Sequence, residues 1–542
     1  MRRNPISLRL TPAALALSLV LAACSDRDPL GPTPREPGGP ALRDVSAQAW
    51  NGNIRIGVVP AAGSVDIGAA AAYEIRDRVT GALLMSGSNG SATVTLQSVI
   101  RSWYRLQVMC GSAAAVATRK AAAEAKGYPT MTEFVPAANC TRLFIGKFDP
   151  PPANTFAART AFKNQLIAEG LAAADAFYVV KADPGVTVYR VARGAQTVDA
   201  NNPVYLTSSD GLVTIAGVVY RGQAEVRVNA AGTLAGINQL PMEEYLYGVV
   251  PRELGPTVFP ELEALKAQAV AARTYALSGL GKRASDGYDL LATTSDQVYG
   301  GYAAEHPMST QAVDETAGIA ATYDGKLITA LYSSTTGGHT ADNEEAFNSA
   351  PVPYLRGVPD AERGQAFEHV PSLEVFRSHA NAASLRNAKE GDFESDWARF
   401  HRWTFEWSAE EISEVISAYA GQPVGRVLAI NVTQRGPSGR AIAIEYVTEA
   451  GTFTDTRDHI RTSLKFINTS GQLQSLLSTL FYIEPVLDRK TGEVDGFVVY
   501  GGGFGHGVGL SQTGAVGMAE KGRAYDEILK HYYQGIELTK WY

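Results

Sequence analysis

Short runs of alternating apolar and polar residues, interrupted by a different pattern, most constrain how this chain folds. Between residues 53 and 97 the runs NIRIGVV, AYEIRD, ALLMSG and ATVTLQ are separated by glycine and serine turns. Similar runs, among them TVYRVA, PVYLTS and LVTIAG, return between residues 187 and 240. Such runs are typical of strands with one buried face. We therefore expect one β-rich module that an insert interrupts.

The insert carries a strand, helix, strand pattern twice between residues 102 and 183. WYRLQVMC precedes the helix candidate AAAVATRKAAAEAKG, and TRLFIGKF precedes TFAARTAFKNQLIAEG and AFYVVKA. The layout and the phrases YRLQV and RLFIGKF resemble the SPOR domain, whose members bind glycan strands that lack stem peptides. The resemblance implies a SPOR-like βαββαβ module that binds peptidoglycan; an unrelated ferredoxin-like insert is the alternative.

The first 24 residues predict export. A basic start and a short apolar run lead to LAAC, which ends at Cys24. This resembles a bacterial lipoprotein signal, which implies cleavage after residue 23, lipid on Cys24, and a membrane-anchored protein facing the periplasm or the outside. Residues 24–45, rich in proline and glycine, are then a flexible tether. A plain secretory signal with an incidental cysteine is the alternative, and either one places the chain in the cell envelope.

An exported chain meets oxidising conditions, which leaves two fates for Cys110 and Cys140. They form a disulfide or remain two buried thiols, and their spacing decides neither. The net charge of -7 over 542 residues, without a basic stripe, argues against nucleic acid as a partner. The eight histidines include no HExxH pair, so we expect neither a catalytic metal nor another cofactor.

A helix with a small-residue face is predicted near the middle of the chain. PELEALKAQAVAARTYAL begins at Pro260, and we expect Pro260 and Glu261 to form its first turn. Before it, VVPRELGP is interpreted as an extended, turn-bounded segment that holds Glu253 among apolar residues. The residues alone favour a surface turn or an ion pair for Glu253. Glu243 and Glu244 are expected on a solvated face.

Five phrases in order resemble the SpoIID/LytB family. They lie at residues 243–277, 296–302 (DQVYGGY), 332–347 (YSSTTGGHTADNEEAF), 353–358 (PYLRGV) and 501–522 (GGGFGHGVGLSQTGAVGMAEKG). The resemblance covers most of residues 220–542. It implies a mixed α+β, β-rich body with packed helices over residues 184–542.

That body divides into a β-rich lead-in over residues 184–240 and a catalytic-type region over residues 241–542. Residues 46–101 form the β-rich N-terminal module, and residues 102–183 the SPOR-like insert. Some sporulation-type relatives carry a zinc site where this chain has Ser295 and Asp296, so we expect no zinc there.

The SpoIID/LytB resemblance implies work on peptidoglycan. Its sporulation branch contains lytic transglycosylases, which cleave between N-acetylmuramic acid and N-acetylglucosamine to give 1,6-anhydro products; its other branch enhances separate cell-wall amidases. Carried onto this chain, the catalytic acid falls on Glu253, and one carboxyl serves as acid and then as base. A non-catalytic enhancer that binds an amidase partner is the competing function, and a structural wall-binding lipoprotein is a third.

Nine further residues are candidates for binding the glycan, because sugars call for hydrogen-bond donors and an aromatic platform. The predicted helix supplies Lys266, Gln268, Arg273 and Tyr275, the hydroxyl-rich phrase supplies Ser333 and Ser334, and the glycine stretch supplies His506, Ser511 and Gln512. For the helix residues, solvation or anchoring of the helix is the alternative; for the serines and His506 it is packing. The glycine spacing fits neither a dinucleotide loop nor a P-loop, so we expect tight turns and a small-faced helix that ends near Gly522.

Overall fold

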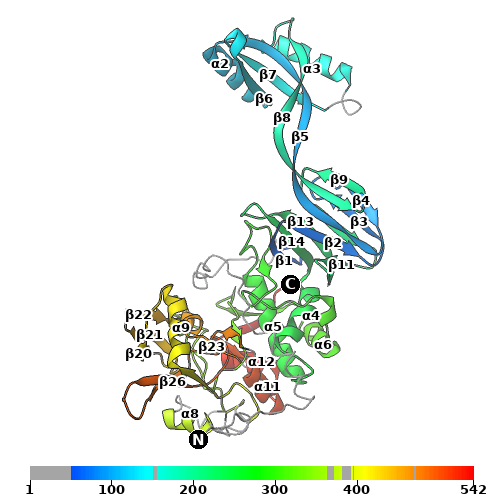
Figure 1. Ribbon diagram of the computed structural model, residues 1–542. Coiled ribbons are helices and arrows are strands. Elements are labelled where there is room, and N and C mark those ends of the chain that lie inside the picture. Colours follow the sequence, from blue (N-terminus) through cyan, green and yellow to red (C-terminus); the bar gives the residue numbers. More distant parts are fainter. Residues whose placement is uncertain (1–49, 150–154, 363–371, 381–391, 395, 469–470) are drawn as a thin grey trace.

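A computed structural model describes residues 50–542, apart from 150–154, 363–371, 381–391, 395 and 469–470. The predicted signal, Cys24 and the tether lie outside the described residues. The insert stands at one end, and a long two-stranded ribbon joins it to the β-rich module (Figure 1). The rest of the chain, residues 241–542, follows the module and is called the helical body below. Of the helices described, none has the length and apolarity that a membrane crossing requires.

The β-rich module consists of two sheets that share one core. Their orders are β15-β1-β14-β13-β10-β3-β4 and β12-β11-β2-β5-β7-β6, with β8 also pairing with β5 and β9. Ile54 and Ile56 of the first sheet pack in the same buried cluster as Val65 and Val94 of the second. The strands are β1 Asn53–Ala62, β2 Ser64–Ala69, β3 Tyr73–Asp77, β4 Leu83–Gly87, β5 Gly90–Gly111, β8 Phe177–Arg193, β9 Gln196–Ala200, β10 Val204–Ser208, β11 Leu212–Ile215, β12 Val218–Arg221, β13 Gln223–Val228, β14 Leu234–Pro241 and β15 Leu290–Leu291.

The insert has the predicted strand and helix pattern. Its four strands follow the order β8-β5-β7-β6, every neighbouring pair is antiparallel, and its apolar core includes Leu106, Leu143 and Leu166. This ferredoxin-like order is common to both interpretations of the insert. Its elements between β5 and β8 are α2 Ala113–Glu124, β6 Thr130–Val135, β7 Cys140–Phe148 and α3 Phe156–Ala168.

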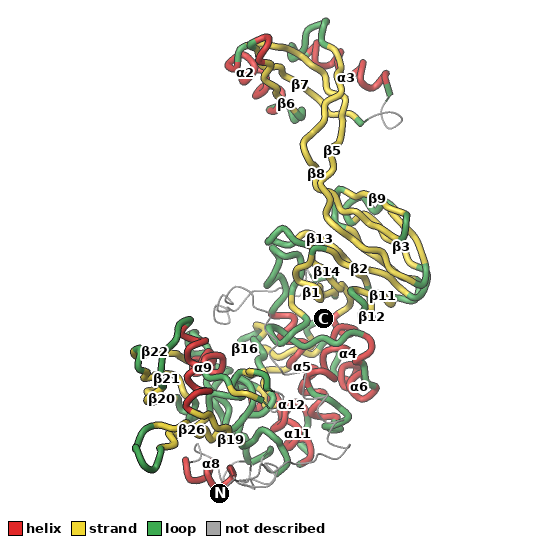
Figure 2. Tube along the Cα trace, in the orientation of Figure 1, coloured by secondary structure: helices red, strands yellow, loops and turns green. Residues whose placement is uncertain are grey.

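β5 and β8 belong to both the module and the insert. They pair without interruption of either strand from Thr93 opposite Ala192 to Gln107 opposite Phe177, with one bulge. The predicted boundaries at residues 101–102 and 183–184 therefore fall inside continuous strands. The ribbon between the two bodies is visible in Figure 2 as two yellow tubes, β5 and β8, that run side by side in opposite directions.

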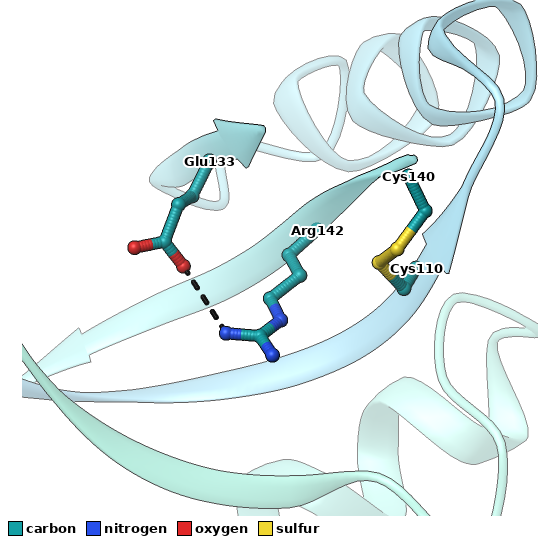
Figure 3. The surroundings of a disulfide bond; sticks show 4 residues. All are labelled: Cys110, Glu133, Cys140 and Arg142. Atoms are coloured by element: carbon teal, nitrogen blue, oxygen red, sulfur yellow. Dashed lines mark hydrogen bonds and ion pairs between the residues drawn. A yellow bond between two sulfur atoms is a disulfide. The ribbon is translucent and has the colours of Figure 1, made fainter. Parts of the chain in front are cut away.

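A disulfide closes the far end of the insert. Cys110, near the end of β5, and Cys140, the first residue of β7, are bonded, and their Cα atoms are 5.6 Å apart (Figure 3). Beside it, Arg142 of β7 contacts Glu133 of β6 at 3.5 Å. Of the two alternatives for these cysteines, a disulfide or two buried thiols, the structure shows the disulfide.

The helical body corrects two expectations. Glu253 is the last residue of helix α4 (Met242–Glu253) and does not lie in an extended segment. The helix tolerates Pro251, which cannot donate a backbone hydrogen bond. The stabilisation from the fully buried Val249 and Val250 outweighs the loss of that one bond. The next helix, α5 (Leu262–Ser278), begins after Glu261, its N-cap, so Pro260 stands outside it.

Helix α5 lies at the centre of the body. Its alanines allow close packing, and nearly every residue from Ala264 to Leu277 is buried. Around it pack α6 (Pro307–Glu315), α11 (Gln512–Glu520) and α12 (Tyr525–Tyr532). The small-faced helix predicted for the glycine stretch is α11, which ends just before Gly522.

A second apolar core, which we did not anticipate, lies between residues 403 and 501. It contains Trp403, Trp407, Ile416 and Phe497 and is separate from the core around α5. Two three-stranded sheets and α9 enclose it. Their elements are β19 Trp403–Ser408, α9 Ala409–Ala420, β20 Val427–Arg435, β21 Ala441–Thr448, β22 Gly451–Thr456, β25 Phe481–Leu487 and β26 Val494–Gly501.

Candidate functional site

The site is built around the Glu253 carboxyl at the end of α4. Its Oε1 accepts a hydrogen bond from the backbone N–H of Val298 at 2.6 Å. The side chains of Gln512 and Tyr332 approach the same carboxyl as hydrogen-bond donors. Val298 lies in the DQVYGGY phrase, so three phrases far apart in the sequence converge on one carboxyl.

The surroundings of Glu253 keep its proton near neutral pH. Burial raises its pKa from 4.5 to about 7, against the lowering effect of Val298, Gln512, Tyr332 and the charge of Arg252. Arg252 is exposed, and Glu253 as a residue is partly exposed. A carboxyl that holds its proton near neutral pH, on a partly exposed residue, is suited to donate a proton to a ligand.

A pair of short parallel strands brings the serine phrase beside the glycine stretch. β18 (Tyr332–Ser333) pairs with β27 (Leu510–Ser511), with Tyr332 opposite Leu510 and Ser333 opposite Ser511. Ser511 caps α11 by accepting a hydrogen bond from the Gly514 N–H at 3.1 Å. The pairing therefore places Tyr332 and Gln512 on the same side of the site.

The four glycan-binding candidates on helix α5 lie on two opposite faces of the helix. Gln268 and Tyr275 are seven residues apart and share a face, and helical geometry puts Lys266 and Arg273 on the opposite side. Gln268 Oε1 accepts from Gln512 Nε2 at 3.3 Å. The Tyr275 hydroxyl donates to Asp296 at 3.1 Å, and Tyr275 is close enough to Glu253 for that charge to raise its pKa, although burial is the larger cause.

Lys266 and Arg273 form ion pairs on the α6 side of α5. Lys266 Nζ lies 2.7 Å from both Glu263 and Glu315. The Arg273 side chain is fully buried and lies 2.5 Å from Glu243, which also accepts from the Gly318 N–H at 2.9 Å. Glu243 therefore does not simply face solvent, as we had expected, because it is the partner of a buried arginine.

The two candidate serines lie at the end of β18 and directly after it. The Ser333 hydroxyl is buried and has no hydrogen-bond partner among the described residues. Ser334 Oγ is 3.3 Å from the Thr335 hydroxyl, and its carbonyl accepts from the Thr513 N–H at 3.0 Å. These contacts favour packing, the alternative to glycan binding, for both serines.

His506 ties the glycine stretch to β18. Its Nδ1 accepts from the Val508 N–H at 3.0 Å, its ring packs against Phe347 at 5.4 Å, and it bonds the backbone of Tyr332. Burial lowers its pKa to about 4, so the imidazole is neutral near pH 7. These contacts hold Tyr332 in place beside Glu253.

A buried acidic group that sequence reasoning missed fixes the wall of the site. Glu394 accepts from Gly337 N–H at 2.6 Å, from Thr513 Oγ1 at 2.7 Å and from Ser511 Oγ at 3.3 Å, and it pairs with His401 at 3.1 Å. Burial would raise its pKa, but His401 and these donors lower it to about 2. No motif surrounds Glu394 in the sequence, so only the fold reveals it.

Asp296, next to which we expected no zinc, is held by ion pairs and a backbone hydrogen bond. Its fully buried carboxylate lies 2.5 Å from Lys282 and 3.2 Å from Arg283, and accepts from the Leu291 N–H at 2.9 Å. These bonds cross-link the loop that carries Asp296 to residues 282–291. Within the described part of the chain, no group of three or more His, Cys, Asp or Glu side chains is arranged to hold a metal.

Two family models match the body. Residues 230–323 match the model described as Stage II sporulation protein, SpoIID, and residues 341–509 match a domain of unknown function, DUF8618. The first range holds Glu253, Val298 and α5. The second holds the separate core and Glu394.

Curated relatives align with more than half of the chain. An uncharacterized protein of Brachyspira hyodysenteriae is 32% identical, over 62% of this chain and 77% of the relative. The Amidase enhancer of Bacillus subtilis is 32% identical over 55% of this chain, but the alignment spans only 40% of that protein. Stage II sporulation protein D of Bacillus amyloliquefaciens is 28% identical, over 56% of this chain and 76% of the relative.

Proposed function

Because the chain belongs to the SpoIID/LytB family, we propose that it is an exported lytic transglycosylase of bacterial peptidoglycan with Glu253 as its catalytic residue. In this reaction the bond between the anomeric carbon of N-acetylmuramic acid and the oxygen of N-acetylglucosamine breaks. The muramic acid 6-oxygen forms a new bond to the same carbon. Glu253 first donates its proton to the leaving oxygen and then accepts the proton of the 6-hydroxyl, so it ends as it began.

The observation that carries this proposal is a carboxyl with a pKa of about 7 on a partly exposed residue. Such a group is protonated in about half of the molecules at neutral pH. It is therefore able to act first as an acid and then, once ionised, as a base of matching strength.

Among the residues that the structure describes, the buried carboxylates Asp296 and Glu394 do not supply a second catalytic group. Hydrolysing glycosidases use a second carboxylate as nucleophile or as base for water. Asp296 is fully buried and paired with Lys282 and Arg283. Glu394 is fully buried and pairs with His401. An intramolecular hydroxyl as nucleophile, which needs one carboxyl only, fits this arrangement.

The second candidate function is a non-catalytic enhancer of a cell-wall amidase, because the Bacillus subtilis relative at 32% identity is named for that role. In both candidates the protein binds glycan strands and sits in the envelope through a lipidated Cys24. In both, the insert at residues 102–183 adds a second contact with peptidoglycan.

The chain without residues 1–24, incubated with purified peptidoglycan, tests the proposal. We expect 1,6-anhydro-muropeptides by mass spectrometry from wild type and from Glu244→Gln, a matched change on the same helix, but none from Glu253→Gln. If wild type releases no anhydro product and instead stimulates an added amidase, the enhancer function replaces the enzyme.

A further inference from the structure

A line of buried hydrogen bonds runs from the interior of the body to Glu253. The Tyr245 hydroxyl donates to Gln297 Oε1 at 3.2 Å, and Gln297 Nε2 donates to the Tyr332 hydroxyl oxygen at 2.9 Å. Tyr245 and Gln297 are completely buried. Tyr332 is the last member and approaches the carboxyl.

The direction of this line is fixed by a backbone carbonyl. Gln297 Nε2 also lies 3.2 Å from the carbonyl oxygen of Ala272, which only accepts hydrogen bonds. The nitrogen of the Gln297 amide must therefore be on that side, and its second proton points to Tyr332. Since the Tyr332 oxygen accepts there, its own proton is free to point at Glu253.

We propose that Tyr332, oriented by Gln297, is a positioning residue that holds a proton donor against the Glu253 carboxyl. This deepens the proposed function and rests on it for its catalytic meaning, although the approach of Tyr332 to Glu253 is a property of the protein alone. The family phrase YSSTTGG then contributes through its tyrosine, in addition to the serines that we first considered.

The arrangement also decides which oxygen of Glu253 carries the acid proton. Oε1 accepts the Val298 N–H at 2.6 Å, and a backbone amide has no means of accepting a proton in return. Because the carbonyl oxygen of a neutral acid is the better acceptor, this bond favours Oε2 as the oxygen that carries the proton. A Tyr332 donor stabilises the ionised form that the second step needs, without preventing protonation in the first.

Tyr332 stays a donor throughout the working pH range. Burial, and next the charge of Glu253, raise its pKa well above 10. The other titratable groups around Glu253 are Arg252 and Tyr245 on α4, and Tyr275 on α5 with its partner Asp296. Burial also raises the pKa values of Tyr245 and Tyr275, so neither of these phenols titrates near the pKa of Glu253.

The test is a titration of Glu253 in the absence of substrate. Protein labelled with ¹³C at glutamate carboxyls is followed by NMR, and the Glu253 signal is assigned by its absence in Glu253→Gln. In Tyr332→Phe, which lacks the donor, we expect the apparent pKa of Glu253 to rise by about one pH unit. Tyr446→Phe removes a buried, hydrogen-bonded hydroxyl in the separate core and should leave the Glu253 titration unchanged.

A Tyr332→Phe titration that superimposes on wild type overturns the inference. If that variant does not fold by circular dichroism, Gln297→Leu carries the test, because it keeps Tyr332 but removes the bond that orients it. A smaller rise of the Glu253 pKa then supports the inference, and no rise overturns it. Since no activity is measured, failure of the transglycosylase proposal leaves this result readable.

Discussion

At the scale of single residues, Glu253 is placed where its charge is costly. The folded protein raises its pKa from 4.5 to about 7, so ionisation favours the unfolded chain over that range. Stability from this group is fully present below pH 4.5 and is lost as the pH rises through 7. A buried carboxyl whose ionisation lowers the stability of the fold is more typical of a functional site than of a stabilising interaction.

Glu253→Gln should therefore stabilise the protein in a pH-dependent way. The glutamine carries no charge, so the variant does not lose stability as the pH rises through 7. The amount by which its free energy of unfolding exceeds that of wild type should therefore be about 2 to 3 kcal/mol larger at pH 8 than at pH 5. Urea denaturation at the two pH values measures this difference. Glu244→Gln is the matched control, and an equal change at both pH values for Glu253→Gln would contradict the raised pKa.

The same pKa predicts the pH dependence of the proposed reaction. The acid step needs protonated Glu253, so kcat/KM should fall above a pH of about 7, by about tenfold for each further unit. The rate of anhydro-product release from soluble glycan chains, followed from pH 5 to pH 9, measures this limb. Binding of the glycan by Glu253→Gln over the same range serves as the control. A rate that is flat from pH 7 to pH 9 would exclude Glu253 as the acid.

The resemblance to the family, more than the local sequence pattern, singled out Glu253 as the candidate catalytic acid. The proline-rich segment VVPRELGP predicted extended backbone, and the fold shows helix because buried Val249 and Val250 override the local preference. On α5 the spacing separates Gln268 and Tyr275 from Lys266 and Arg273. Only the packing partners tell which pair lies on the Glu253 side, and these partners are distant in sequence.

At the scale of elements, a loop from the DUF8618 region is built into the wall of the site. Gly517 of α11 lies so close to residue 393 that an added Cβ would be 1.8 Å from the Phe393 carbonyl oxygen. Glu394, the next residue, bonds the α11 cap through Ser511. Helix α11 in turn begins with Gln512, so residues 393–394 fix the element that contacts Glu253.

Gly517→Ala should destabilise the protein by about 1 to 3 kcal/mol, because the backbone of residue 393 has to move away from α11. The free energy of unfolding from denaturant titration measures the loss, and the Glu253 titration should shift with it as Gln512 moves. Gly63→Ala is the control, since a Cβ at Gly63 meets nothing within 4 Å. Equal stability of the two variants would show that α11 does not depend on this close approach.

At this scale the sequence predicted the helices and strands, but not which of them share an apolar core. The strands of the alternating runs, the two helices of the insert and the helix α11 within the glycine stretch all occur as expected. The separate core within residues 403–501 was not predicted, because its strands and helix carry no motif and periodicity does not report which buried faces meet.

At the scale of the whole molecule, the insert is held away from the body by a single β-ribbon. β5 and β8 are the strands that continue from the β-rich module into it, as Figure 1 shows. The insert has its own apolar core and its own disulfide between Cys110 and Cys140. These features are those of a unit that folds by itself and is appended to the site-bearing body.

The ribbon offers a precise place to remove the insert. Ser98 and Thr187 are opposite each other on β5 and β8, so an Asn-Gly turn that replaces residues 99–186 closes a two-residue hairpin. Because the body keeps its core, we expect an unchanged thermal transition of the body and unchanged release of anhydro products from short soluble glycans.

Binding to whole, insoluble peptidoglycan should respond differently. If the insert is a second contact with the polymer, its removal should weaken binding about tenfold or more, since two linked contacts raise the effective concentration of each. Co-sedimentation with purified sacculi measures the affinity, and Glu253→Gln with the insert intact is the control for binding without cleavage. Equal affinity with and without the insert would show that residues 102–183 do not hold the wall and that the body alone binds it.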